Sequence, residues 1–166
     1  MVAKLREKPG GERIPVAIGD FASTRVEDEF RLAYLVFNTS MNLTTQAEQV
    51  ACFEDVAAHL EPGGVFVIEV GVPRPSATIR VLDAGGDHWG IDEFDIATQG
   101  SISHHFQRRE DGAFELLSMP FRYAWPAELD LMATLAGIRL RDRWAGWRGE
   151  PFTSESRRPV SVWEKT

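Results

Sequence analysis

The chain has 166 residues, of which 43% are hydrophobic and 26% are charged, so its length matches one ordinary domain with enough apolar residues to form a core. This composition excludes an intrinsically disordered chain and a fibrous repeat. The 18 basic and 25 acidic residues give a formal net charge of -7, and no basic cluster is longer than a pair, which argues against nucleic acid as a partner.

The single cysteine and the first residues of the chain indicate in which cellular compartment the protein is found. The one cysteine, Cys52, falls in an apolar helical pattern, so we expect a buried, inert thiol in a reducing compartment and no cysteine-based metal site. Charged residues recur within the first eight positions, and no apolar stretch there is long enough for a signal peptide. The longest apolar runs are too short to cross a bilayer. We therefore expect a cytoplasmic protein with no membrane partner.

The first half of the chain alternates between strand and helix patterns. Residues 1–8 predict a short helix, residues 14–18 alternate as a strand, and the continuous apolar run 32–37 predicts a strand buried in a parallel sheet. Thr45 and Glu48 form a capping-box pattern before a helical apolar stripe, and residues 65–70 give the next strand. The order strand, helix, strand is that of a parallel crossover.

After Pro73 the pattern becomes antiparallel. Residues 102–108 face residues 114–125 across a turn at Glu110-Asp111-Gly112, which predicts a hairpin within an antiparallel insertion spanning about 74–125. Pro126 then starts a helix, and residues 138–144 and 160–163 close the chain as strands. The fold class predicted is α/β: an incomplete doubly wound, Rossmann-like sheet in a single domain, 1–166, with an antiparallel β insertion after the third recognisable strand.

Polar side chains follow each predicted parallel strand. Asp20-Phe21, Asn38-Thr39 and Glu69 stand at the three strand ends, where ligands bind in parallel α/β sheets. Asp20 could accept a hydrogen bond from an adenine amino group while Phe21 packs on the ring; an ordinary turn cap after Gly19 is the alternative. Together the strand ends predict a ligand crevice.

These residues carry a family resemblance. Gly19-Asp20-Phe21-Ala22, Phe37-Asn38-Thr39, and the Leu60-Glu61-Pro62-Gly63-Gly64 turn before an apolar strand resemble class I S-adenosylmethionine-dependent methyltransferases. The segment from Tyr123 to Ile138 is similar to the last helix and penultimate strand of the family. The resemblance covers nearly the whole chain.

The beginning of the family pattern has no counterpart. No two glycines are separated by a single residue, so the Gly-x-Gly loop near the methionine part of the cofactor is absent, as are the first strand and the acidic end of the second. We therefore expect a C-terminal part of a methyltransferase, impaired in cofactor binding. Its unpaired apolar sheet edges would favour pairing with another copy of the chain.

The resemblance implies methyl transfer from S-adenosylmethionine to a small-molecule acceptor. It would place Asp20 and Phe21 at adenine and Asn38 between cofactor and acceptor. A further set would contact the acceptor under the insertion: Thr39, Glu69, Trp89 and Tyr123. For a catalytic base we favour His88, because histidine titrates near neutral pH.

Other readings of the same residues stay open. His104 and His105 point to opposite faces of a strand, so at most one of them can face a cleft. Arg157-Arg158 would meet an anionic substrate, although a solvated pair is the simpler expectation. A noncatalytic interaction module is the competing function. A hydrolase is weaker, because no Gly-x-Ser-x-Gly elbow exists.

Overall fold

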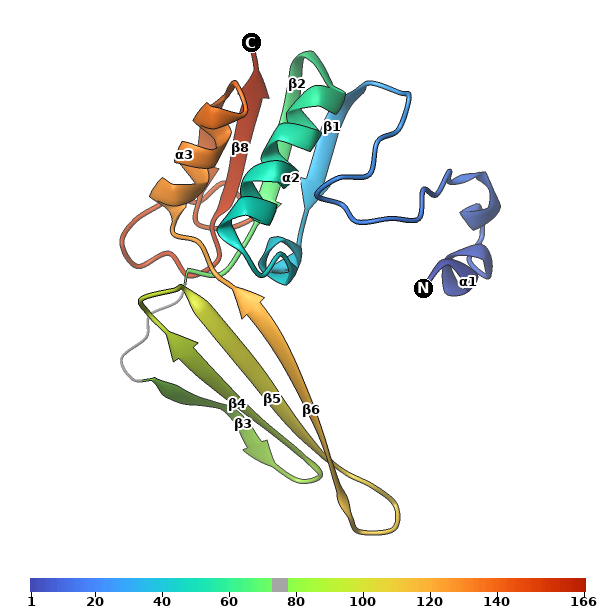
Figure 1. Cartoon of the computed structure of the whole chain (residues 1–166), viewed down its shortest axis with the longest axis vertical. Coiled ribbons are helices and arrows are strands. Elements are labelled where there is room, and N and C mark those ends of the chain that lie inside the picture. The colour runs from blue at the N-terminus through green and yellow to red at the C-terminus, as the bar shows by residue number, and fades with distance from the viewer. Residues whose placement is uncertain (73–77) are drawn as a thin grey trace.

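The computed structural model describes residues 1–72 and 78–166, and it contains two separate four-stranded sheets (Figure 1). The core sheet has the order β1-β2-β8-β7, with bounds Phe30–Leu35, Leu60–Glu69, Val160–Lys165 and Ile138–Trp144 respectively. Strands β1 and β2 are parallel neighbours, as the sequence predicts, while β8 runs antiparallel to β2 and β7 antiparallel to β8. The predicted α/β sheet is confirmed.

Two helices cover one face of the core sheet (Figure 1). Helix α2, Gln46–His59, begins with the predicted capping box, in which Thr45 and Glu48 satisfy each other's backbone amides. Helix α3, Pro126–Leu135, has Pro126 in its first turn, where the missing N–H costs nothing. Beneath them the sheet contributes Phe66, Ile68 and Trp163, all at most 1% exposed, so the core lies between this face and the helices.

The predicted insertion forms the second sheet. Its antiparallel strands follow the order β3-β4-β5-β6, with bounds Ile79–Gly85, His88–Asp95, Gly100–Arg108 and Phe114–Arg122. In Figure 1 it extends away from the core below the carboxyl ends of β1 and β2. The first predicted insertion residues, 74–77, lie outside the described part of the chain.

The N-terminal region differs from the prediction. Helix α1, Val2–Arg6, is present, followed by the short helices η1, Gly11–Arg13, and later η2, Thr39–Asn42. The strand predicted for residues 14–18 is wrong: this segment is irregular, and Ile18 is 88% exposed. A strand needs a neighbour for its backbone groups, and within residues 1–72 and 78–166 no strand runs beside it. Alternating apolar residues alone do not supply that neighbour.

Strand β1 lies at an edge of the core sheet. In the described part of the chain it pairs with β2 along one side. Leu32 and Tyr34 are 53% and 63% exposed, on the face that α2 and α3 leave uncovered. The edge and the apolar side chains beside it are thus open to solvent.

Candidate functional site

A cavity of about 610 Å³ lies between the carboxyl ends of β1 and β2 and one face of the insertion sheet. We call it the strand-end cavity. The core contributes Asn38, Met41, Gly71, Val72, Arg157 and Arg158 to its lining, and the insertion contributes Arg80, Leu82, Asp92, Phe94, Ser101, Ser103 and Phe121. The crevice at the strand ends therefore exists, with the insertion as its second wall.

Asn38 is fixed at the end of β1 by an unusual backbone. Phe37 and Asn38 both have a φ of 57°, a left-handed conformation that costs energy for residues other than glycine. The side-chain oxygen of Asn38 accepts a hydrogen bond of 2.7 Å from the Gly71 backbone N–H, which joins the segments after β1 and β2. Phe37 is 82% exposed beside it. Such strain is typical of functional positions.

Glu69 and Thr39 support the strand ends rather than line the cavity. The Glu69 carboxylate accepts a hydrogen bond from the Phe37 N–H at 3.1 Å, and the Glu69 carbonyl accepts one from the Asn38 N–H at 3.3 Å. The Thr39 hydroxyl donates to the Val36 carbonyl at 2.6 Å. Both residues, predicted to contact an acceptor, thus hold the left-handed turn in place.

Asp20 and Phe21 lie in a turn outside the cavity lining. The Asp20 carboxylate accepts a hydrogen bond of 2.8 Å from the Ala22 N–H, which is the turn-capping arrangement. Phe21 is half-buried and packs, together with Leu35 from the end of β1, against the small apolar cluster of Ala22, Leu43 and Cys52. The turn is therefore anchored next to the end of β1.

The same apolar cluster buries the thiol of Cys52. Cys52 is 2% exposed, and burial, reinforced by the nearby charges of Asp55 and Asp20, raises the pKa of its thiol to about 12. A thiol with that pKa stays protonated at neutral pH and is a poor nucleophile or metal ligand. The predicted burial of Cys52 is confirmed.

The insertion wall of the cavity is polar and partly charged. Arg80 and Asp92 form an ion pair of 3.4 Å across β3 and β4, and Ser103 lies opposite Asp92 on β5. Arg157 and Arg158 face them from the loop before β8. On the insertion side Asp92 balances Arg80, so Arg157 and Arg158 make the core side of the cavity positive in a chain of net charge -7. The Arg157-Arg158 pair was expected to be solvated, because the long stretch of chain between it and Asn38 conceals how close the two segments lie in the fold.

The histidines fall on two faces of the insertion sheet. The Nε2 of His88 lies 2.9 Å from the Nδ1 of His105, and the Nε2 of His105 lies 3.2 Å from the Ser103 hydroxyl. Since Ser103 lines the cavity, this chain of contacts begins there. His104 points to the opposite face, where its Nδ1 lies 2.8 Å from the Ser118 hydroxyl. His88, the predicted base, is thus two hydrogen bonds from the cavity through His105.

Trp89 and Tyr123 are not part of the cavity lining. Trp89 pairs with Phe106 on the outer face of the insertion sheet and is 50% exposed. Tyr123 is fully buried behind Phe94, with ring centroids 6.1 Å apart. Burial, with a smaller effect of the Asp95 charge, raises the pKa of Tyr123. The aromatic side chains that line the cavity are Phe94 and Phe121, whereas Trp89 and Tyr123 were the ones predicted to contact the acceptor.

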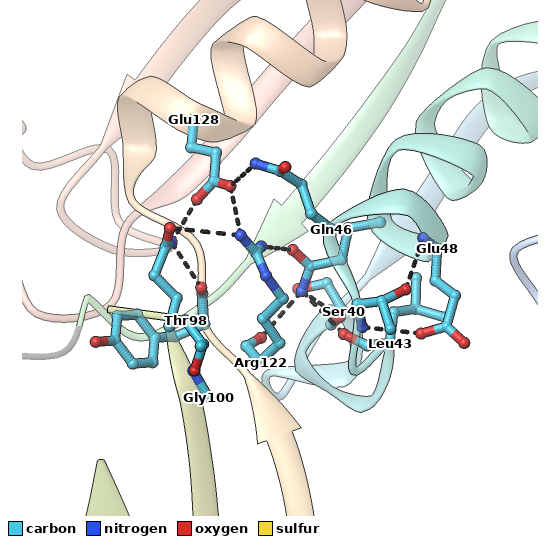
Figure 2. Close-up of polar contacts among 12 residues, drawn as sticks. Ser40, Leu43, Gln46, Glu48, Thr98, Gly100, Arg122 and Glu128 are labelled. Atoms are coloured by element: carbon cyan, nitrogen blue, oxygen red, sulfur yellow. Dashed lines mark hydrogen bonds and ion pairs between the residues drawn. The ribbon is translucent and has the colours of Figure 1, made fainter. Parts of the chain in front are cut away.

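A buried polar network joins the insertion to the helices (Figure 2). Arg122, at the end of β6, donates to the Glu128 carboxylate of α3 at 2.7 Å and to the Gln49 side chain of α2 at 2.5 Å. Gln46 and Gln99 also donate to Glu128, at 2.8 and 2.5 Å. Burial would raise the pKa of Glu128, but hydrogen bonds from Gln99, Arg122 and Gln46 outweigh it and lower that pKa. This network fixes the insertion relative to the core.

The described residues offer neither a metal site nor a membrane-spanning helix. Among residues 1–72 and 78–166, no group of three or more histidine, cysteine or acidic side chains is arranged to hold a metal ion. No helix in that part of the chain is long and apolar enough to span a bilayer.

Comparison with known proteins identifies the family. No protein-family model matches the chain. The chain is 28% identical to the cypemycin N-terminal methyltransferase of a Streptomyces species, covering 97% of this chain and 69% of that relative. The structure of the CcbJ methyltransferase from Streptomyces caelestis superposes with a TM-score of 0.88 at 31% identity, covering 99% of this chain and 68% of the other. This chain belongs to the S-adenosylmethionine-dependent methyltransferases.

A more distant structure supports the same fold. The glycopeptide N-methyltransferase MtfA, complexed with S-adenosylmethionine, superposes with a TM-score of 0.64 at 15% identity, over 99% of this chain and 66% of that one. The resemblance and the fold class predicted from the sequence are therefore confirmed for this methyltransferase chain.

Proposed function

We propose that this chain transfers a methyl group from S-adenosylmethionine to an amine nitrogen of a small molecule or peptide bound in the strand-end cavity. The observation that carries the proposal is the cavity of about 610 Å³ at the carboxyl ends of the parallel strands β1 and β2, where α/β proteins bind ligands. That volume suits a small organic acceptor. An amine is favoured because the relative at 28% identity is named an N-terminal methyltransferase.

The strand-end residues fit the cofactor in part. When bound, S-adenosylmethionine supplies a methyl carbon on a positively charged sulfur, which a nucleophile attacks. Phe37 offers an exposed ring to an apolar group such as adenine, and the Asn38 amide borders the cavity. Asp20 and Phe21, anchored beside the end of β1, would hold the adenine edge. Alignment by these residues is the main assistance that an in-line displacement needs.

The side chains of the cavity walls would bind the acceptor. The groups available for polar contacts are Ser103, Asp92 and the three arginines that line the cavity, and Phe94 and Phe121 supply its apolar surface. Thr39 and Glu69 would act through the backbone that they hold. A small acceptor with both an apolar body and polar groups matches this lining.

We also infer that the 166-residue chain binds S-adenosylmethionine weakly. It contains no Gly-x-Gly sequence, and such a loop lets backbone approach the cofactor closely in this family. A noncatalytic role as an interaction module is the competing function. The exposure of Leu32 and Tyr34 beside the open edge of β1 favours it, because apolar edges invite pairing with other chains.

Two measurements test the proposal. Calorimetric titration of the 166-residue chain should give a Kd for S-adenosylmethionine weaker than micromolar; a micromolar value, about -8 kcal/mol, contradicts weak binding. Transfer of radiolabelled methyl at millimolar cofactor to a tripeptide amide with a free N-terminus should be detectable above a no-enzyme control. A folded chain that transfers no label to this probe or to an amino sugar supports the noncatalytic role instead.

A variant at Phe37 separates binding from folding. Phe37→Gly relieves a left-handed conformation worth about 1–2 kcal/mol, which offsets the backbone entropy of glycine of about 0.5–1 kcal/mol. Stability should therefore hold while cofactor affinity falls. Phe114→Ala, an exposed aromatic in β6, is the matched control and should leave affinity unchanged. Unchanged affinity in Phe37→Gly would remove this residue from the cofactor site.

A further inference from the structure

Ser103, His105 and His88 form a continuous hydrogen-bonded chain that starts at the strand-end cavity and runs along β5 to β4. Ser103 is 8% exposed and lines the cavity. Its hydroxyl is 3.2 Å from the His105 Nε2, and the His105 Nδ1 is 2.9 Å from the His88 Nε2. Both distances lie within or at the edge of hydrogen-bond range. Polar groups connected in this way can pass a proton from one to the next.

The sheet register produces this alignment. Ser103 and His105 are two residues apart on β5, so their side chains share one face. Gly90 lies directly opposite His105 on β4, and with no side chain there the His105 ring can reach diagonally to His88. The two imidazole planes differ by 27° and their centroids are 5.2 Å apart. Neither ring belongs to the outer face that carries His104.

The direction of the two hydrogen bonds is coupled. A neutral imidazole has one N–H donor and one acceptor nitrogen, so His105 donates from one ring nitrogen and accepts at the other. If Ser103 donates to the His105 Nε2, then the His105 Nδ1–H donates to the His88 Nε2. In that arrangement a proton that arrives at the Ser103 oxygen moves away from the cavity. The reverse arrangement points every proton into the cavity.

We propose that Ser103, His105 and His88 form the proton acceptor for the amine that is methylated. The inference rests on the proposed function, because an ammonium group has no lone pair and must lose a proton before it attacks the methyl carbon. The ammonium proton passes to the Ser103 oxygen, the Ser103 proton to the His105 Nε2, and the Nδ1 proton of His105 to the His88 Nε2. His88 ends as an imidazolium. The freed nitrogen lone pair forms the N–C bond, and the electron pair of the broken C–S bond stays on sulfur.

Histidine suits this role because it ordinarily changes protonation between pH 5 and 8. Several charged groups lie near these three side chains. Asp92 lies opposite Ser103 on the neighbouring strand and is paired with Arg80. Gln107 lies opposite both His88 and Glu115, so these side chains share one face of the sheet. The core side of the cavity adds Arg157 and Arg158. The positive charges of Arg157 and Arg158 favour release of a proton from an ammonium group bound in the cavity.

The first test needs no turnover. A long-range ¹H–¹⁵N spectrum of the labelled 166-residue chain at pH 8 reports which nitrogen of His105 carries the proton. We expect it on Nδ1, with the Ser103→Ala variant changing the Nε2 shift of His105. A proton on Nε2 means that the hydrogen bonds point into the cavity, which overturns the proposal. An Nε2 shift that is unchanged in Ser103→Ala overturns it as well.

The second test uses methyl transfer to the tripeptide amide, whose amino group has an ordinary pKa of about 7.7–8.0. At pH 7 that group is about one-tenth neutral, so His105→Phe and His88→Phe should lower kcat about 10-fold. At pH 9.5 the amine is already neutral, and the loss should fall below 2-fold. His104→Phe, the adjacent residue on the opposite face, should match the unsubstituted chain at both pH values.

The outcomes separate the two proposals. An equal loss at pH 7 and pH 9.5 assigns the histidines a structural role and overturns the relay. A chain that methylates no peptide at either pH contradicts the proposed function, whereas the His105 spectrum still decides whether the relay can accept a proton from the cavity.

Discussion

Removal of the Arg122 guanidinium should destabilise the protein strongly, because it leaves a buried carboxylate without its partner. The side chains of Arg122 and Glu128 are 6% and 13% exposed, and their atoms are 2.7 Å apart. Breaking a buried pair by removing one partner typically costs about 3–5 kcal/mol. For a domain of this size each kcal/mol lowers Tm by roughly 2–4 °C, so Arg122→Met should melt roughly 6–20 °C lower.

The stability that Glu128 contributes depends on pH. The pKa of Glu128 is lowered in the folded chain, so its contribution to stability is present above the ordinary glutamate pKa and is lost as pH falls through the lowered value. Without Arg122 the pKa of Glu128 rises, since burial remains while one donor is gone. The difference in free energy of unfolding between the unsubstituted chain and Arg122→Met should therefore increase from pH 3 to pH 7.

Thermal unfolding followed by circular dichroism measures both quantities. The double variant Arg122→Met with Glu128→Gln is the control, because it removes the orphaned charge and should be more stable than Arg122→Met alone. A loss below about 1 kcal/mol, or a difference that does not change with pH, would refute the view that the network of Figure 2 depends on this ion pair.

Three further predictions concern local structure. Thr45→Ala should lower the free energy of unfolding by about 1 kcal/mol through loss of the α2 cap, while Thr44→Ala, one residue earlier, should change it little. Cys52, with a pKa raised to about 12, should resist a thiol reagent at pH 8 until the chain is unfolded; rapid labelling of the folded chain would contradict its burial. Asp20→Ala should cost about 1 kcal/mol because the Ala22 N–H loses its acceptor; calorimetry on the same variant tests adenine binding, and Asp20→Asn, which keeps an acceptor oxygen, should retain stability.

Local signals predicted most of the fold. The capping box at Thr45, Pro126 at a helix start and the apolar run before Asn38 each specify structure within a few residues. Residues 14–18 show the limit of such signals, because alternation marks a segment that can be a strand but not the neighbour that makes it one. Where the described chain offers no neighbour, Ile18 remains exposed.

The candidate site was predicted less completely. Asn38 was found because a polar residue that ends a continuous apolar run is visible in the sequence. Ser103 and His105 carry a signal that could have been used, since two polar residues at spacing two share a face of a strand. Their link to His88 depends on the register of β4 against β5, and the meeting of Arg157 with Asn38 depends on tertiary folding. Neither is encoded in local spacing.

The left-handed pair Phe37 and Asn38 connects stability to function in this chain. A bulky residue at φ 57° costs about 1–2 kcal/mol, and its ring is 82% exposed, so packing returns little of that energy. Hydrogen bonds from the two backbone N–H groups to Glu69 and from Gly71 to the Asn38 side chain hold the strained turn. Three hydrogen bonds thus restrain a conformation that the local sequence disfavours, at the point where β1 meets the cavity. Because this turn is maintained at such a cost with its apolar side chain facing solvent, we propose that a ligand covers it.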